Sequence, residues 1–214
     1  MPTPDHWPVF LHNIIVLLNS FQRLIMRKFK SLTVFLAIII THVNVHSQGV
    51  QAKVIDSIKA ELAKANKLEE KMYWLDNLSR TLMNFDLKEA EKYGNEMIRI
   101  AEESRDRSMM IESYMSNGLR CSYLAAQREY GDKSVMFYNR ALELARDNKM
   151  DEETGAAQLR LSDVYLSLSE NEKALYMANQ AFSLLSTLSN DSLKVEANNL
   201  YGRVYIVAMK RYWL

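Results

Sequence analysis

Residues 163–182 read DVYLSLSENEKALYMANQAF, and this stretch decides the fold that the sequence predicts. It contains the end of one amphipathic helix, a short polar turn and the start of a second helix. Ser169 is followed three residues later by Glu172, which is the spacing of a capping box at a helix start. Small side chains that let a neighbouring helix approach closely then fall on one face of the second helix: Ala174, Ala178 and Ala181. The stretch therefore predicts a helical hairpin.

The same hairpin pattern recurs along the chain at a nearly fixed spacing. In the expected first helices, a displacement of 40 residues aligns three small residues: Ser122, Ser162 and Gly202. In the expected second helices, displacements of 44 and 40 residues align another set: Ala90, Ser134 and Ala174. A fixed period with matching residue sizes indicates a stacked array of repeats.

These hairpins resemble tetratricopeptide repeats (TPRs). In that family the first helix has a small residue near its middle and an aromatic residue three positions later, and the second helix has two alanines seven apart. The best match in this chain is formed by Ser162, Tyr165, Ala174 and Ala181. The resemblance covers about residues 68–214 and implies an all-α fold, a right-handed α-solenoid of about three and a half hairpins. The family's proline near the repeat end is missing, because all three prolines precede residue 9.

The expected organisation divides the chain into a leader, an entry helix and an array. The segments are an upstream extension (1–25), a signal peptide (26–47), an entry or capping helix (48–66) and the TPR array (67–214), with units at about 67–106, 107–149, 150–189 and an incomplete 190–214. Within the array, helices are expected over 68–83 and 87–104, and the Tyr130-Gly131-Asp132 triplet is expected to be the internal turn of the second hairpin. The helix over 192–209 is expected to be the first of a pair whose second helix is missing.

The leader has the features of an export signal. A basic segment, residues 26–30, precedes an apolar segment, residues 32–40, and small residues precede a cut before Gln48. We therefore expect the mature protein outside the cytoplasm, periplasmic or associated with the cell envelope, and Met26 as the initiator. The alternative is that residues 1–46 form an uncleaved anchor or a folded helical pair.

The distribution of residues argues against catalysis and nucleic-acid binding. All four histidines precede Gln48, the one cysteine is Cys121, and the six glycines are scattered singly, so no catalytic, cofactor or metal residues are expected. Residues 1–48 hold four of the 27 basic and one of the 26 acidic residues, which leaves 23 and 25 in the remainder. The remainder lacks the positive charge that nucleic-acid binders carry.

The resemblance implies a groove, lined by the first helix of each hairpin, that binds a protein or peptide. The expected groove residues are Leu75, Ser79, Leu119, Arg120, Tyr123, Leu159, Arg160, Asp163, Asn199 and Arg203. Arg120 and Arg160, 40 residues apart, are candidates to hold a carboxylate or peptide carbonyls. The alternative is that they pair with acidic side chains of neighbouring helices. The family's carboxylate clamp for chaperone tails is not present as a set.

The leader, entry helix and repeats together resemble the extracytoplasmic TPR region of bacterial sensor histidine kinases. This resemblance implies a non-catalytic, exported interaction module for scaffolding or signal sensing. The alternative is a truncated sensor part of a two-component histidine kinase or transcriptional regulator whose output domain is missing. Membrane contact is then expected only through an uncleaved leader or a missing C-terminal segment.

Overall fold

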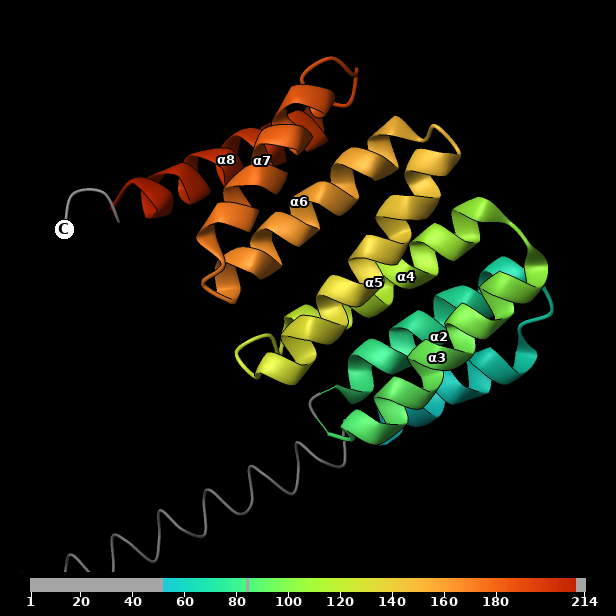
Figure 1. The fold of residues 1–214 in the computed structure, drawn as a ribbon. Helices are drawn as coiled ribbons and strands as arrows, with labels where there is room; N and C mark the ends of the chain where they lie inside the picture. Colours follow the sequence, from blue (N-terminus) through green and yellow to red (C-terminus); the bar gives the residue numbers. More distant parts are fainter. Residues whose placement is uncertain (1–51, 84, 211–214) are drawn as a thin grey trace, which may run out of the picture. The chain divides into compact units, whose positions relative to one another are not determined.

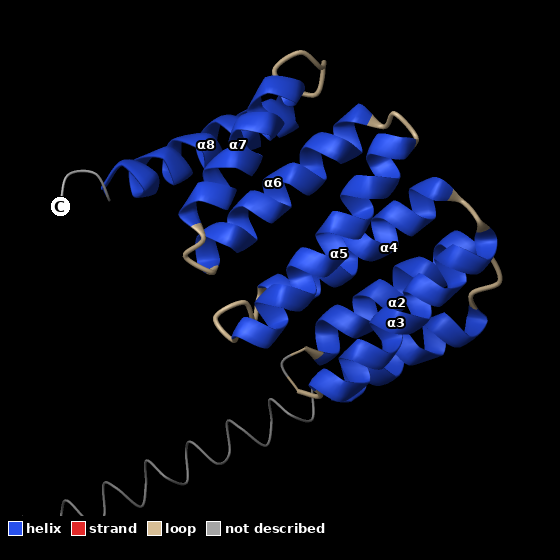
Figure 2. Cartoon of the chain, viewed as in Figure 1, coloured by secondary structure: helices blue, strands red, loops and turns tan. Residues whose placement is uncertain are grey.

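The described part of the chain is entirely α-helical, as the hydrophobic periodicity predicts. The computed structural model describes residues 52–83 and 85–210, and these contain helices and no strand (Figures 1 and 2). Residues 52–64 form the entry helix, and the helices that follow are α2 (Leu68–Leu82), α3 (Leu87–Ser104), α4 (Arg107–Ser122), α5 (Arg128–Asp147), α6 (Asp151–Ser167), α7 (Asn171–Leu185) and α8 (Asp191–Lys210). The predicted upstream extension, the predicted signal peptide and residues 211–214 lie outside the described residues.

Helices that follow each other in the chain pack side by side. Short loops join α2 to α3, α4 to α5, and α6 to α7, and each of these pairs is in contact (Figure 1). Each even-numbered helix also contacts the next even-numbered one, and none of α2–α8 contacts a helix more than two places away. The entry helix packs Ile55, Ile58 and Leu62 against buried residues of α2 and α3.

Polar side chains link neighbouring hairpins at the spacing seen in the sequence. First helices are joined by bonds such as Asp163–Arg203, and second helices by bonds such as Glu91–Lys133 and Arg128–Glu170. Across all polar bonds that join two first helices or two second helices of neighbouring hairpins, the bonded residues lie 34 to 42 positions apart in the sequence. This range brackets the period of about 40 residues read from the sequence.

Small residues form the closest contact inside each hairpin. The Ser79 hydroxyl donates to the Ala90 carbonyl, the Ser134 hydroxyl to the Gly118 carbonyl, and the Ser162 hydroxyl to the Ala174 carbonyl, each at 2.8 Å. All three serines are buried, and Ala174, Ala178 and Ala181 are at most 1% exposed, so the predicted close approach of the second helix is confirmed.

These contacts correct one part of the sequence alignment. Gly118, not Ser122, stands opposite Ser134 in the second hairpin. Gly118 and Ser134 are 16 residues apart, whereas the corresponding residues of the first and third hairpins are 11 and 12 apart. The reason is that both the loop between α4 and α5 and the part of α5 before Ser134 are longer than their counterparts.

The predicted turn at Tyr130-Gly131-Asp132 is wrong, because these residues lie inside α5. Gly131 is buried, and a Cβ at this position would lie 2.5 Å from Leu168 Cδ2. A glycine inside a helix costs about 1 kcal/mol relative to alanine. At Gly131 the missing side chain lets Leu168 approach the backbone of α5, so packing outweighs the turn propensity.

The predicted capping box at Ser169 is also wrong. The side chain of Asp86 caps α3, but α7 has Glu170 at its N-cap without a side-chain hydrogen bond. Ser169 instead adopts a left-handed φ of 62°. Its N–H donates to the Leu166 carbonyl at 3.0 Å, and the Glu170 N–H donates to the Tyr165 carbonyl at 2.8 Å. This is the Schellman pattern that ends a helix, so Ser169 terminates α6.

Replacing Ser169 with glycine should stabilise the protein by about 0.5 to 1 kcal/mol, because glycine adopts the left-handed conformation without steric cost. The matched control is Ser167→Gly, the same chemical change two residues earlier inside α6, which should destabilise by a similar amount. Urea unfolding of the two variants measures both effects. A destabilised Ser169→Gly protein would contradict this conformation at the end of α6.

Candidate interaction surface on the first helices

The exposed polar residues of α2, α4, α6 and α8, together with Leu119 of α4 and Tyr123 directly after α4, form the candidate site, which we call the first-helix surface. Its side chains that are at least partly accessible are Asp76, Arg80, Ser116, Leu119, Tyr123, Arg160, Asp163, Glu196, Asn199 and Arg203. The helices present these residues because their other sides are apolar and pack against neighbouring helices. Apart from Leu119, which packs against the core, the surface therefore consists of positions that the core does not use.

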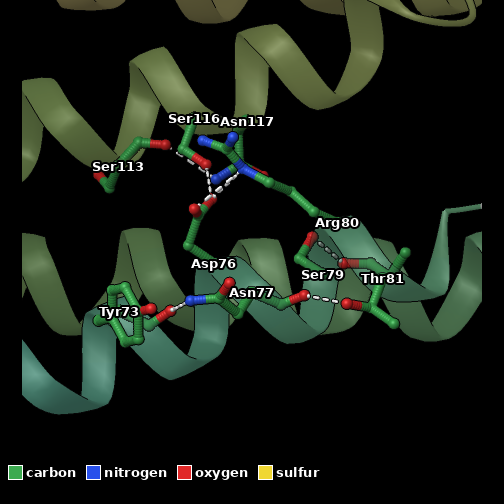
Figure 3. A network of polar contacts seen from close by, with 10 residues as sticks. Tyr73, Asp76, Asn77, Ser79, Arg80, Thr81, Ser113, Ser116 and Asn117 are labelled. Carbon is green, nitrogen blue, oxygen red and sulfur yellow. Dashed lines mark hydrogen bonds and ion pairs between the residues drawn. The ribbon is translucent and has the colours of Figure 1, made fainter. Parts of the chain in front are cut away.

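Asp76 is the centre of a polar network between α2 and α4 (Figure 3). Its carboxylate pairs with Arg80 Nε at 2.9 Å, one turn later on α2, and accepts a hydrogen bond from the Ser116 hydroxyl of α4. Its side chain is 21% exposed. A partly buried carboxylate held from two helices fixes the spacing of these helices on this surface.

Two ion pairs join α6 and α8 on the same surface. Asp163 accepts from Arg203 at 2.8 Å, and Arg160 pairs with Glu196. Both pairs are substantially exposed, so each contributes about 0 to 1 kcal/mol and exchanges readily with solvent. Charged or polar groups of a partner can therefore replace these ion pairs with their own contacts at a low cost in free energy.

Four of the ten predicted groove residues do not lie on an accessible surface. Leu75, Ser79, Arg120 and Leu159 are each at most 3% exposed. Ser79 occupies the hairpin crossing opposite Ala90, and Leu75 and Leu159 belong to the hydrophobic core. The other six are at least partly accessible, and Tyr123 is 66% exposed.

Arg120 and Arg160 do not form the predicted pair in adjacent repeats. Arg120 is buried, donates to Asn117 Oδ1 at 3.0 Å and leaves its Nε without a partner. Arg160 is accessible and pairs with Glu196, so for this residue the structure matches the alternative of a carboxylate on a neighbouring helix. The hypothesis that the two arginines together hold a ligand carboxylate is therefore wrong.

Sequence reasoning missed four residues of the surface: Asp76, Arg80, Ser116 and Glu196. The missed signal was the spacing, since Asp76 and Ser116 are 40 residues apart, as are Asp163 and Arg203. A search for complementary polar residues at the repeat period would have found Asp76 and Ser116, whereas Arg80 and Glu196 bond residues 4 and 36 positions away.

Cys121 is a buried thiol. It is 1% exposed, and burial raises the pKa of the thiol above its ordinary value, which keeps it protonated at neutral pH. Within residues 52–83 and 85–210 there is no cluster of three or more histidine, cysteine or acidic side chains arranged to bind a metal ion. A separate search of the same residues finds no helix that is long and apolar enough to span a membrane.

An open cleft of about 760 Å³ lies apart from the first-helix surface, among the entry helix, α2 and α3. Its lining combines apolar residues such as Leu62 and Ile100 with the charged residues Lys71 and Arg99. Arg99 bonds both Glu96 and Glu103, and the bond from Arg99 lowers the pKa of Glu96. The charge inside this cleft is therefore largely neutralised within α3.

Arg120→Ala should destabilise the protein by about 2 to 4 kcal/mol, because it removes a buried side chain and leaves the Asn117 carbonyl oxygen without a donor. Arg160→Ala should cost less than about 1 kcal/mol, because it removes an exposed ion pair. Urea unfolding measures how much each of the two alanine variants lowers the free energy of unfolding. Equal costs would contradict the burial of Arg120.

The comparisons with known proteins give this chain no family. A search of protein-family models finds no match, and the comparison with curated protein sequences finds none either. The arguments about its function therefore rest on the residues and contacts described above.

Proposed function

We propose that this chain is a non-catalytic protein-interaction module, built as a right-handed α-solenoid of TPR-like hairpins. The observation that carries the proposal is the set of polar bonds between equivalent helices of neighbouring hairpins, 34 to 42 residues apart. The recurring small-residue crossing, with its hydroxyl–carbonyl bond of 2.8 Å, supports the same arrangement. In such an array each unit contacts only its neighbours, and the exposed face of the first helices is continuous.

The first-helix surface favours a protein or peptide partner. It offers carboxylates, guanidinium groups, amide and hydroxyl groups, and the exposed ring of Tyr123. Such groups bind peptide main chain and charged side chains together, and aromatic residues with arginine are typical of interface hot spots. The charges alternate in sign along α6 and α8, so the partner we expect is of mixed charge and not a polyanion.

The exported location and the signalling role belong to the same proposal. The basic and apolar segments before Gln48 support export to the periplasm or cell envelope. The alternative assignment, the sensor part of a histidine kinase or transcriptional regulator, rests on the resemblance of leader, entry helix and repeats. A kinase-like reading frame directly downstream of the gene would favour this alternative over a free-standing module.

The interaction surface can be tested with peptides that are selected from a displayed random library for binding to the full chain. We expect their dissociation constants to rise at least about tenfold with Tyr123→Ala, which corresponds to about 1.4 kcal/mol of lost binding energy. The control is Met136→Ala, since Met136 is 56% exposed on the second helix α5. Peptides that respond to Met136→Ala and ignore Tyr123→Ala would overturn the first-helix surface as the site.

Mass spectrometry of the protein expressed from its own gene in a bacterial host tests export. We expect the mature chain to begin at Gln48 and to appear in the periplasmic or secreted fraction, because the segment before it has the pattern of a cleaved signal. The control is a variant with Lys28→Glu and Lys30→Glu, which removes positive charge from the basic segment. In this variant the leader should not be cleaved. A chain that still begins with Met1-Pro2 would contradict the proposal.

A further inference from the structure

A shallow pocket with a volume of about 540 Å³ lies between α6 and α7. Gln158 of α6 lines it together with side chains of α7 and of the residues directly after α7. One of these side chains, Gln180, accepts a hydrogen bond from Arg146 of α5 at 3.0 Å. By contrast, α8 contacts a different side of α7, where Phe182 stacks on Tyr201. The pocket therefore lies among α5, α6 and α7, away from the side of α7 that α8 covers.

Hydrogen bonds fix the orientation of two amide side chains in this pocket. The guanidinium of Arg146 can only donate, so the group of Gln180 that faces it is the oxygen, Oε1. Gln180 Nε2 then donates to the Tyr176 hydroxyl at 2.6 Å, and Gln158 Nε2 donates to Gln180 Oε1 at 2.9 Å. If the Gln158 amide were turned over, two amide oxygens would face each other. Gln158 Oε1 therefore points away from Gln180.

Gln158 Oε1 is a buried acceptor without a donor. The residue is 4% exposed, and none of the described residues donates a hydrogen bond to this atom. Buried polar side-chain atoms in proteins are nearly always hydrogen-bonded, because an unpaired one has lost its bonds to water without replacement. Since Gln158 also lines the pocket, a donor group of a ligand in the pocket is the partner that this oxygen lacks.

All side chains that line the pocket are uncharged, whereas the cleft among the entry helix, α2 and α3 contains charged groups such as Lys71 and Arg99. The lining consists of three amides, two hydroxyl groups, one leucine and the ring of Tyr176, which is 58% exposed. Amide and hydroxyl groups both donate and accept hydrogen bonds, and the face of a tyrosine ring is apolar. The pocket therefore suits an uncharged ligand with many hydroxyl groups and an apolar ring face.

We propose that this pocket binds a neutral carbohydrate, an oligosaccharide of about two or three sugar rings, since its volume lies in the range of about 300 to 1,000 Å³ that is typical of small-molecule sites. A hydroxyl group of one sugar donates to Gln158 Oε1, and the apolar face of a ring stacks on Tyr176. The exposed side chains of Asn179 and Ser183 bind further hydroxyl groups. The site uses no residue of the first-helix surface and does not depend on the function proposed for that surface.

The test is a titration of maltotriose, cellotriose and triacetylchitotriose, each separately, into the ¹⁵N-labelled full chain. For at least one of these sugars we expect saturable shifts of the side-chain amide signals of Gln158, Asn179 and Gln180, with a dissociation constant below about 10 mM. These signals report on the pocket directly, because the three amide groups line it. Triglycine and adenosine are the comparison probes and should not shift them, since a peptide or a nucleoside offers fewer hydroxyl groups.

Tyr176→Ala removes the ring on which the sugar stacks. The variant should remain folded, because the side chain is exposed, and it should bind the sugar at least about tenfold more weakly. The matched control is Tyr73→Ala, because Tyr73 is 61% exposed on α2 and does not line the pocket. This control should leave the dissociation constant unchanged.

Gln158→Met tests the unpaired oxygen, because it keeps the length of the side chain and leaves Gln180 Oε1 bonded to Arg146. Its melting temperature should stay within about 3 °C of that of the wild type, and the sugar should bind at least about tenfold more weakly. The proposal is overturned if no sugar gives saturable shifts, or if triglycine or adenosine gives the same shifts at a lower concentration. Sugar binding that is unaffected by the two pocket variants, or weakened equally by Tyr73→Ala, also overturns it.

Discussion

The contact between two small residues at each hairpin crossing is the interaction on which the rest of the structure depends. Each crossing puts two helix backbones close enough for a serine hydroxyl to reach a main-chain carbonyl of its partner helix. The hydrogen bond satisfies a buried hydroxyl that would otherwise cost about 1 to 3 kcal/mol. A larger side chain at Ala90 or Ala174, both fully buried, would separate the helices and remove this bond.

The contacts between hairpins follow from this arrangement within them. Because the helices of a hairpin lie so close together, each presents a narrow, regular surface to the next hairpin, and the polar bonds between hairpins recur at nearly the same spacing. No contact joins helices of α2–α8 more than two places apart. The stability of each helical pair therefore depends mainly on its immediate neighbours.

The first-helix surface offers mainly electrostatic interactions to a partner. The first-helix surface is polar, with exposed ion pairs such as Asp163–Arg203, and gives orientation and specificity more than affinity.

The sequence by itself determined the helices, their approximate ends and the faces that pack. Periodicity and the alanine spacing of α7 are local signals, so they predict local structure correctly. Only the tertiary structure decided that Arg120 is buried, that Gly131 lies inside a helix and that Ser169 ends α6 instead of starting α7. The burial of Arg120 and the packing of Gly131 against Leu168 depend on which helix lies next to the residue. Those contacts join residues that are distant in the chain, and the periodicity of a single helix does not record them.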